Sequence, residues 1–119
     1  GISLWAVIRK EDGAFVGHCG LTWQDASGED VLEIGYLFKR AYWHNGYAAE
    51  AARGCKRYAF DVLRAEKICS IIRETNTASI HVAERNGMAP ASHFTKHYRG
   101  VDMPHVMYCI TREMYENAE

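Results

Sequence analysis

The chain has 119 residues, of which 48% are hydrophobic and 24% charged, and its formal net charge is -1. These values fit one folded domain and argue against a disordered chain. A charge this close to zero gives no electrostatic reason to expect nucleic acid or an anionic membrane as the main partner. Neither a signal peptide nor a membrane-spanning run is visible.

The first residues predict a pair of antiparallel strands. Residues 2–10 are rich in β-branched and aromatic side chains, and Asp12-Gly13 directly after them is a strong hairpin signal. Residues 14–23 alternate with the period of a strand. We expect these two strands to pair, and the polar segment "QDASGED", residues 24–30, to form the loop that follows.

The next segment, "VLEIGYLF" (residues 31–38), is expected to be a strand with two different faces. Leu32, Ile34, Tyr36 and Phe38 fall on one face, whereas Glu33, Gly35 and Leu37 fall on the other. Glu33 is therefore a carboxylate within an apolar strand.

Residues 46–63 predict an amphipathic helix, and "KICSIIR" (residues 67–73) predicts a strand that is buried on both sides. Strand, helix and strand in this order imply a right-handed parallel crossover. The residues that recur at helical spacing, and that we expect to face the core, are Ala51, Cys55, Tyr58, Ala59 and Val62.

A second helix is predicted within "NTASIHVAERNGM", residues 76–88. Asn76 or Thr77 could cap its start, and Asn86-Gly87 is a typical helix end. Residues 88–99 and 105–115 then predict two more strands, joined as a hairpin around "GVDMP".

The cysteines and histidines give little reason to expect a metal site. His93 and His97 are four residues apart, which in a strand separates them by about 13 Å, too far to share one ion. The cysteines form no C-x-x-C pair, so we expect reduced, buried thiols in a cytoplasmic protein rather than a disulfide framework. They are Cys19, Cys55, Cys69 and Cys109.

The start of the first helix, "YWHNGYAAEA", suits an anion. A helix N-terminus carries unpaired N–H groups and a partial positive charge, and small residues such as Gly46 and Ala48 leave these groups accessible to a phosphate. A tight strand-to-helix connection is the structural alternative, because one glycine-rich turn is a weak signal.

Residues 33–54 followed by residues 76–88 resemble the GNAT superfamily of acetyl-CoA-dependent N-acetyltransferases, in particular the branch of ribosomal-protein N-terminal acetyltransferases. Residues 43–48 match the family's Q/R-x-x-G-x-G/A pyrophosphate loop, with Trp43 in the place of Arg or Gln. Asn76 and Ser79 match its N-x-x-A/S motif.

The resemblance implies a clamp for acetyl-CoA. Backbone groups of the strand before the loop would bind pantetheine, the loop amides would hold the pyrophosphate, and Asn76 would bond the pantetheine arm, unless Asn76 is only a helix cap. The implied cofactor residues are Leu37, Phe38, Trp43, His44, Asn45, Gly46, Tyr47, Ala48 and Asn76.

The resemblance also implies two catalytic roles. Glu33 is the candidate general base for the amine, unless it is a structural carboxylate paired with Arg or Lys. In many family members a tyrosine in the second helix protonates the departing thiolate, but the matching position here is Ala83. Ser79 is therefore the substitute proton donor, and Tyr108 is a more distant candidate. Ser79 could equally be an ordinary first-turn residue.

We therefore expect residues 1–119 to form one α/β (α+β) domain of the GNAT type, with a mostly antiparallel sheet, one splayed parallel pair and two main helices, and to lack the family's N-terminal strand and helices. It would transfer an acetyl group from acetyl-CoA to a primary amine, on a small molecule or a protein N-terminus, by direct attack in a ternary complex. The alternative is a non-catalytic acyl-CoA-binding or regulatory module. An exposed first strand could form a homodimer.

Overall fold

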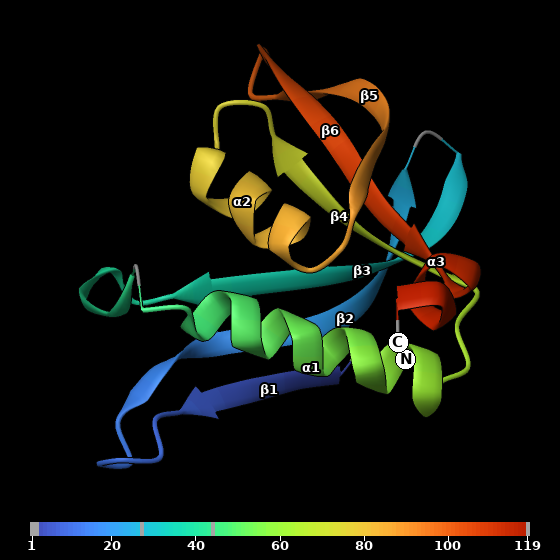
Figure 1. The fold of residues 1–119 in the computed structure, drawn as a ribbon. Coiled ribbons are helices and arrows are strands. Elements are labelled where there is room, and N and C mark those ends of the chain that lie inside the picture. The colour runs from blue at the N-terminus through green and yellow to red at the C-terminus, as the bar shows by residue number, and fades with distance from the viewer. Residues whose placement is uncertain (1–2, 27, 44, 119) are drawn as a thin grey trace.

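A computed structural model describes residues 3–26, 28–43 and 45–118. Within these residues, one six-stranded sheet has the order β1-β2-β3-β4-β6-β5, and only the β3–β4 pair is parallel (Figure 1). This confirms the predicted fold class. The elements are β1 (Ser3–Ile8), β2 (Phe15–Ala26), β3 (Glu29–Phe38), a 3-10 turn η1 (Arg40–Tyr42), α1 (Tyr47–Asp61), β4 (Lys67–Arg73), α2 (Thr77–Arg85), β5 (Ala89–Tyr98), β6 (Val101–Thr111) and α3 (Arg112–Ala118).

The first two hairpins differ in how well the sequence predicted them. The β1–β2 turn is confirmed, with the Gly13 amide donating to the Arg9 carbonyl at 2.8 Å. The expected polar loop over residues 24–30 is wrong, because Gln24 pairs with Val31 and Asp25 with Asp30. Backbone hydrogen bonds can extend an antiparallel ladder beyond the apolar core, so polar side chains did not end these strands.

α1 lies in the crossover between β3 and β4, as predicted, but its buried face is rotated from the predicted one. Cys55 and Ala59 are buried, whereas Tyr58 and Val62 are 37% and 59% exposed. Small side chains allow the helix to lie close to the sheet, and this decides which stripe is covered. The buried residues of α1 are Ala49, Ala52, Cys55, Ala59 and Phe60.

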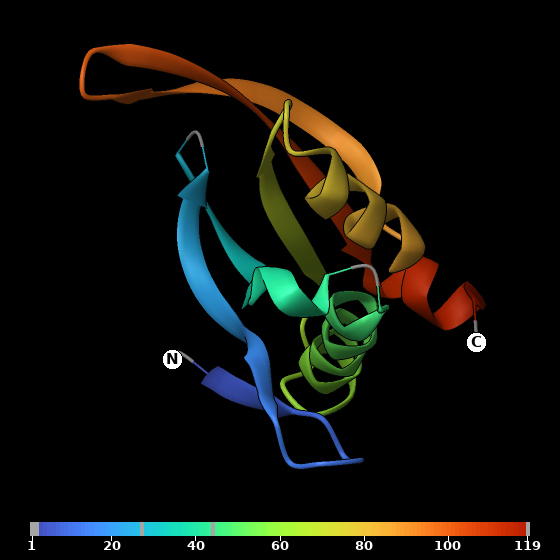
Figure 2. The same cartoon turned by 90° about the vertical axis from the view of Figure 1, so that its left-hand side faces the viewer.

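The sheet has one face covered by helices and one face without a helix among the described residues, which we call the covered face and the open face (Figure 2). Leu32 and Ile34 of β3 belong to the larger core cluster, which includes buried residues of α1, α2 and α3. A smaller cluster on the open face contains Val31, Cys69, Met107 and Cys109. None of the described helices is long and apolar enough to cross a membrane.

α2 ends at Asn86-Gly87, as predicted, with Asn86 as its C-cap. Asn86 also joins α2 to α1. Asn86 is 1% exposed, and its side-chain amide donates to the Ala52 carbonyl of α1 at 3.2 Å. Lys56 of α1 donates back to the Asn86 carbonyl at 3.0 Å. The two helices are thus held together next to the parallel strand pair.

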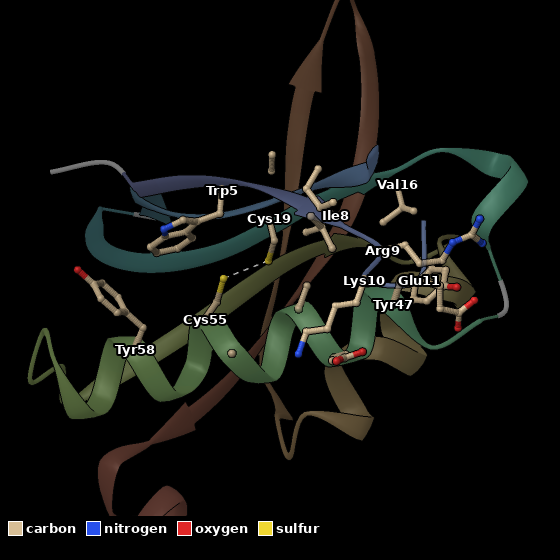
Figure 3. A pocket seen from close by; sticks show the side chains of 15 residues that line it. Trp5, Ile8, Arg9, Lys10, Glu11, Val16, Cys19, Tyr47, Cys55 and Tyr58 are labelled. Atoms are coloured by element: carbon tan, nitrogen blue, oxygen red, sulfur yellow. Dashed lines mark hydrogen bonds between the residues drawn. The ribbon is translucent and has the colours of Figure 1, made fainter. Parts of the chain in front are cut away.

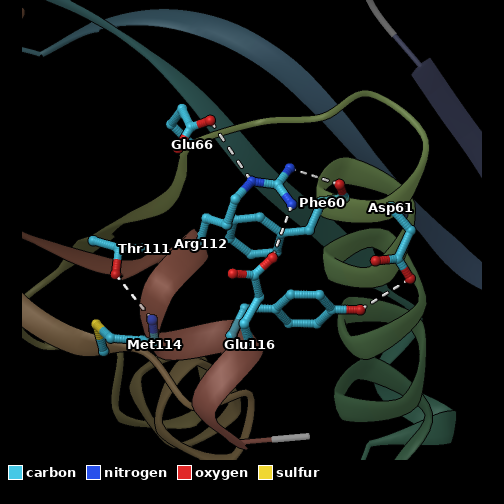
Figure 4. A network of polar contacts seen from close by, with 8 residues as sticks. Phe60, Asp61, Glu66, Thr111, Arg112, Met114 and Glu116 are labelled. Carbon is cyan, nitrogen blue, oxygen red and sulfur yellow. Dashed lines mark hydrogen bonds and ion pairs between the residues drawn. The ribbon is translucent and has the colours of Figure 1, made fainter.

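The C-terminal third contains two corrections. The last hairpin turns at Arg99 and Gly100, so only the first residue of "GVDMP" is in the turn and residues 101–104 belong to β6. Residues 112–118 form α3 instead of continuing the strand. Contacts remote in sequence explain this helix (Figure 4): Arg112 donates to the Phe60 carbonyl at 2.8 Å, and the Tyr115 hydroxyl donates to Asp61 at 3.0 Å.

Candidate functional site

β3 and β4 pair over a short stretch and then separate. Two side chains supply hydrogen bonds between the strands where the backbone ladder stops. The described pairing of the two strands is Glu33 with Cys69. Past this point a Glu33 carboxylate oxygen accepts the Ile71 amide at 3.0 Å, and the Ser70 hydroxyl donates to the Ile34 carbonyl at 3.1 Å. In an uninterrupted parallel ladder such groups would bond the neighbouring strand. Ser70, which the sequence analysis missed, and Glu33 thus satisfy backbone groups where the strands part.

Glu33 is half-buried on the open face. Burial raises the pKa of its carboxyl, while the Ile71 amide and the positive charges of Lys96 and His105 partly oppose that rise. His105 is itself buried, and its Nδ1 lies 2.8 Å from the Met103 carbonyl oxygen. The closest polar partner of Glu33 is therefore a backbone amide, rather than the Arg or Lys considered as its structural alternative.

The start of α1 has no side-chain cap. Gly46 precedes the helix in the left-handed conformation, with φ of 78°, and the first helical bond runs from the Glu50 amide to its carbonyl at 3.0 Å. A Cβ at Gly46 would meet no atom within 4 Å, so the positive φ, and not crowding, favours glycine here. The first-turn amides have no partner within the helix itself, and Gly46 offers no side chain to cap them.

The loop side chains before α1 bond back to their own segment. The Trp43 indole N–H donates to the Phe38 carbonyl at 3.0 Å, and the Asn45 amide donates to the carbonyls of Tyr42 and Trp43, both at 3.1 Å. These bonds fix the loop without covering Gly46. His44, the remaining predicted loop residue, lies outside the described residues.

Two cations precede the loop, and the sequence analysis did not assign them. Lys39 and Arg40 are both exposed, and the Arg40 guanidinium lies 5.3 Å from the centre of the Trp43 ring. Their position in the sequence, directly between β3 and the loop, could have identified them. Glu50, the acidic residue of the first turn, lines a groove between β1 and α1.

The backbone of β3 distinguishes Phe38 from Leu37. The Lys39 amide bonds the Val16 carbonyl of β2, and hydrogen-bonded residues alternate along an antiparallel ladder. Leu37 therefore directs its backbone groups toward β2, whereas Phe38 directs its own toward the opening beside β4. Opposite Phe38, a Cβ at Gly17 would lie 2.5 Å from the Leu37 carbonyl, so glycine is needed for this close approach.

α2 begins with a side-chain cap. The Asn76 side-chain oxygen accepts the Ser79 amide at 3.2 Å, which confirms Asn76 as the predicted cap and leaves its NH2 group outside that bond. The Ser79 carbonyl accepts the Tyr36 hydroxyl at 3.0 Å. Tyr36, another residue not assigned from the sequence, thus connects β3 to the first turn of α2.

A cavity formed by the described residues lies elsewhere. It has a volume of about 570 Å³ and separates β1 from α1, with Trp5, Cys19 and Cys55 among its lining residues (Figure 3). The four cysteines are buried, as predicted. No group of three or more metal-ligating side chains occurs in residues 3–26, 28–43 and 45–118.

Comparison with known proteins gives matches over most of the chain. The family profile described as an acetyltransferase (GNAT) domain matches residues 1–89. The uncharacterized protein YkkB of Bacillus subtilis (strain 168) is 43% identical over 108 residues, which are 91% of this chain and 60% of YkkB. The uncharacterized N-acetyltransferase YnaD of the same strain is 30% identical over 90 residues, 76% of this chain and 52% of YnaD.

A solved structure agrees with these matches. The crystal structure of the acetyltransferase (GNAT family) from Bacillus anthracis has a TM-score of 0.79 at 29% identity and covers 92% of this chain and 66% of its own. This chain therefore spans less than two thirds of the length of these relatives.

Proposed function

The chain belongs to the GNAT acetyltransferase family, and on this premise we propose that it binds acetyl-CoA at the start of α1 and transfers the acetyl group to a primary amine. The observation that carries the proposal is the uncapped helix start at Gly46, which follows the end of β3, the strand that parts from β4. Unpaired amides and the helix dipole stabilise a diphosphate there. Arg40, whose guanidinium lies over the Trp43 ring, would add positive charge to this loop.

The cofactor's pantetheine arm would run from this loop into the opening between β3 and β4. The Phe38 N–H is better directed to bond the thioester end of this arm than the backbone of Leu37, because Leu37 pairs with β2. Asn76 would contribute its NH2 group while its oxygen caps α2. The other loop residues, Trp43, His44, Asn45, Tyr47 and Ala48, would shape the pyrophosphate site.

Glu33 would act on the acceptor from the open face. A protonated alkylamine, with an ordinary pKa of about 10.4, must lose a proton before it can attack the thioester. The raised pKa of Glu33 makes its carboxylate a stronger proton acceptor than an exposed glutamate. Attack would then occur directly in a ternary complex, and the Phe38 N–H would stabilise the developing oxyanion.

The acceptor class is a primary amine on a small molecule or on a protein N-terminus, the latter because of the resemblance to ribosomal-protein acetyltransferases. β1 lies at one edge of the described sheet, which would allow pairing with a second copy. A cytoplasmic location is proposed only because the cysteines show no disulfide pattern.

Thermal melting with and without acetyl-CoA tests the binding step. A ligand at about one hundred times its Kd stabilises a fold by about 2.7 kcal/mol, which is several degrees for a domain of this size. An unchanged Tm would contradict the proposal. Release of CoA thiol across a panel of amines tests transfer, and Glu33→Gln should slow it about 100-fold or more.

A non-catalytic acyl-CoA-binding module is the second candidate. Ala83 occupies the position of the tyrosine expected from the resemblance, and this observation favours the module. A Tm increase with acetyl-CoA, combined with no thiol release for any amine, would support it over the enzyme.

A further inference from the structure

Tyr36 is a hydroxyl donor at the parting of β3 and β4, on the side opposite Glu33. Successive residues of a strand point to opposite faces, so Glu33 and Tyr36, three positions apart, lie on the open and covered faces respectively. The Tyr36 ring is half-buried against the larger core cluster, to which Ala83 also belongs. Its hydroxyl ends at the Ser79 carbonyl on α2.

We propose that Tyr36 donates the hydrogen bond that receives the thiolate leaving acetyl-CoA. The inference rests on the proposed function, because it needs the thioester to lie in the opening between β3 and β4. We place the thioester across this opening, with its acyl carbon toward Glu33 and its sulfur toward the covered face. There the Tyr36 hydroxyl would rotate from the Ser79 carbonyl to the sulfur.

The atoms of this step balance with solvent water as the only further proton carrier. The amine, already neutral, forms the C–N bond and its remaining proton goes to Glu33, which later passes it to solvent, while the C–S bond breaks and its electron pair stays on sulfur. Burial raises the pKa of Tyr36 to about 12, well above the ordinary thiol value of about 8.5. Tyr36 therefore stabilises the thiolate by hydrogen bonding, and the sulfur takes its final proton from water.

Two other hydroxyls on the covered face fit this role less well. Tyr108 is 7% exposed and lies on β6, where it pairs with Ser70 and Pro90, so β4 separates its strand from the opening. The Ser79 side chain lies in the first turn of α2, and only its backbone contacts Tyr36. Ser79→Ala would keep the carbonyl that positions Tyr36, so the two hydroxyls can be separated by mutation.

Tyr36→Phe removes the hydroxyl and keeps the ring. At saturating acetyl-CoA we expect kcat to fall by about 10- to 100-fold, the effect of one hydrogen bond to a charged group. The loss should be the same from about pH 6 to about pH 10, since a hydroxyl with a pKa near 12 stays protonated over that range. A larger loss of kcat in Ser79→Ala than in Tyr36→Phe would assign the role to Ser79 and overturn the inference.

Tyr115→Phe is the matched control. The Tyr115 hydroxyl is also part-buried and donates to Asp61 at 3.0 Å, but it lies between α3 and the end of α1. It should melt at a lower temperature with kcat unchanged. An unchanged kcat in Tyr36→Phe, or an equal loss in Tyr115→Phe, would overturn the inference.

Binding of free CoA gives a readout that needs no acceptor. A thiolate accepts a stronger hydrogen bond than a thiol, so the Tm increase produced by CoA should grow between about pH 7 and about pH 9.5 relative to that of acetyl-CoA. Tyr36→Phe should abolish this growth while keeping the response to acetyl-CoA. If wild-type protein responds to neither compound, the proposed function fails; if both proteins show the same growth with pH, only the role of Tyr36 fails.

Discussion

The two helices that flank the parted strands begin in opposite ways. α1 follows a left-handed glycine with no side-chain cap, whereas α2 is capped by Asn76, and the Ser79 carbonyl in its first turn accepts the Tyr36 hydroxyl. A capped start is complete within the fold. An uncapped start leaves N–H groups that an anionic ligand can satisfy. We infer that α1 begins in a form suited to a ligand, and that α2 begins in a form suited to holding other residues in place.

Where β3 and β4 part, as at the start of α2, side chains of the protein bond backbone groups that would otherwise lack a partner. Ser70 and Glu33 supply hydrogen-bond partners to the Ile34 carbonyl and the Ile71 amide. The strands can therefore separate without leaving these two buried groups unpaired, which keeps an opening in the sheet.

Gly46→Val should produce the largest effect, because it closes the uncapped start. A branched side chain at positive φ is strained by about 1–2 kcal/mol and would stand over the exposed amides. We expect the Kd for acetyl-CoA to rise about 100-fold, about 2.7 kcal/mol. Titration followed by thermal melting or calorimetry measures this change.

Gly13→Val is the control for that variant. Gly13 has φ of 73°, and a Cβ there also meets nothing within 4 Å. It should lose similar stability while its affinity for acetyl-CoA stays unchanged. Equal affinities in the two variants would remove Gly46 from the binding site.

Ser70→Ala should lower the free energy of unfolding by about 1–3 kcal/mol, since it leaves the buried Ile34 carbonyl without a partner. Ser70 is only 3% exposed, so water is poorly placed to substitute. Urea unfolding measures the difference. Ser92→Ala, on the exposed part of β5, should change the free energy of unfolding by less than about 0.5 kcal/mol. Similar losses in the Ser70 and Ser92 variants would contradict the role of Ser70.

Asn76→Ala should cost about 1 kcal/mol by removing the cap of α2. Asn76→Asp keeps the acceptor oxygen and removes only the NH2 group, so it should unfold at nearly the wild-type urea concentration. If Asn76 also bonds pantetheine, Asn76→Asp should still bind acetyl-CoA several-fold more weakly. Wild-type affinity in Asn76→Asp would leave Asn76 as a cap alone.

Glu33→Gln should give the smallest effect on stability, and one that depends on pH. Burial raises the pKa of Glu33 above its ordinary 4.5, so the folded state holds this proton more tightly than the unfolded state does. The resulting stabilisation is fully present below about pH 4.5 and is lost as the pH rises through the raised pKa. Glutamine can still accept the Ile71 amide and does not titrate.

The Tm of Glu33→Gln relative to wild type should therefore increase from about pH 4.5 to about pH 7. Glu84→Gln, exposed on α2, should show no such trend. A Tm difference for Glu33→Gln that does not vary with pH would mean that Glu33 is not held in the buried setting described here.

Local signals explain which parts were predictable. Asp12-Gly13, Asn76 and Asn86-Gly87 act on residues within one turn of themselves, and each marks the expected boundary in the structure. Apolar alternation also located Glu33 on the face opposite Leu32 and Ile34. These features depend on neighbours in the sequence, which a reader of the sequence can see.

The failed predictions involve partners remote in sequence. Residues 112–118 form a helix whose Tyr115 stacks on Phe60 of α1, with ring centres 4.6 Å apart. Tyr58 and Val62 are exposed because the packing of α1 on the sheet selects a different stripe. Neither the stacking of Tyr115 on Phe60 nor the packing of α1 on the sheet can be read from the sequence of the segment concerned.

The sequence by itself determined the order of the strands and helices from β1 to β6, the family, and the glycine at the start of α1. Only the tertiary structure decided that Ser70 and Glu33 complete the ladder where β3 and β4 part, and that the Tyr36 hydroxyl reaches Ser79 on α2. The physical reason is that a helix cap or a turn is satisfied within a few residues. A hydrogen bond between separate elements exists only once packing brings both partners within about 3 Å of each other.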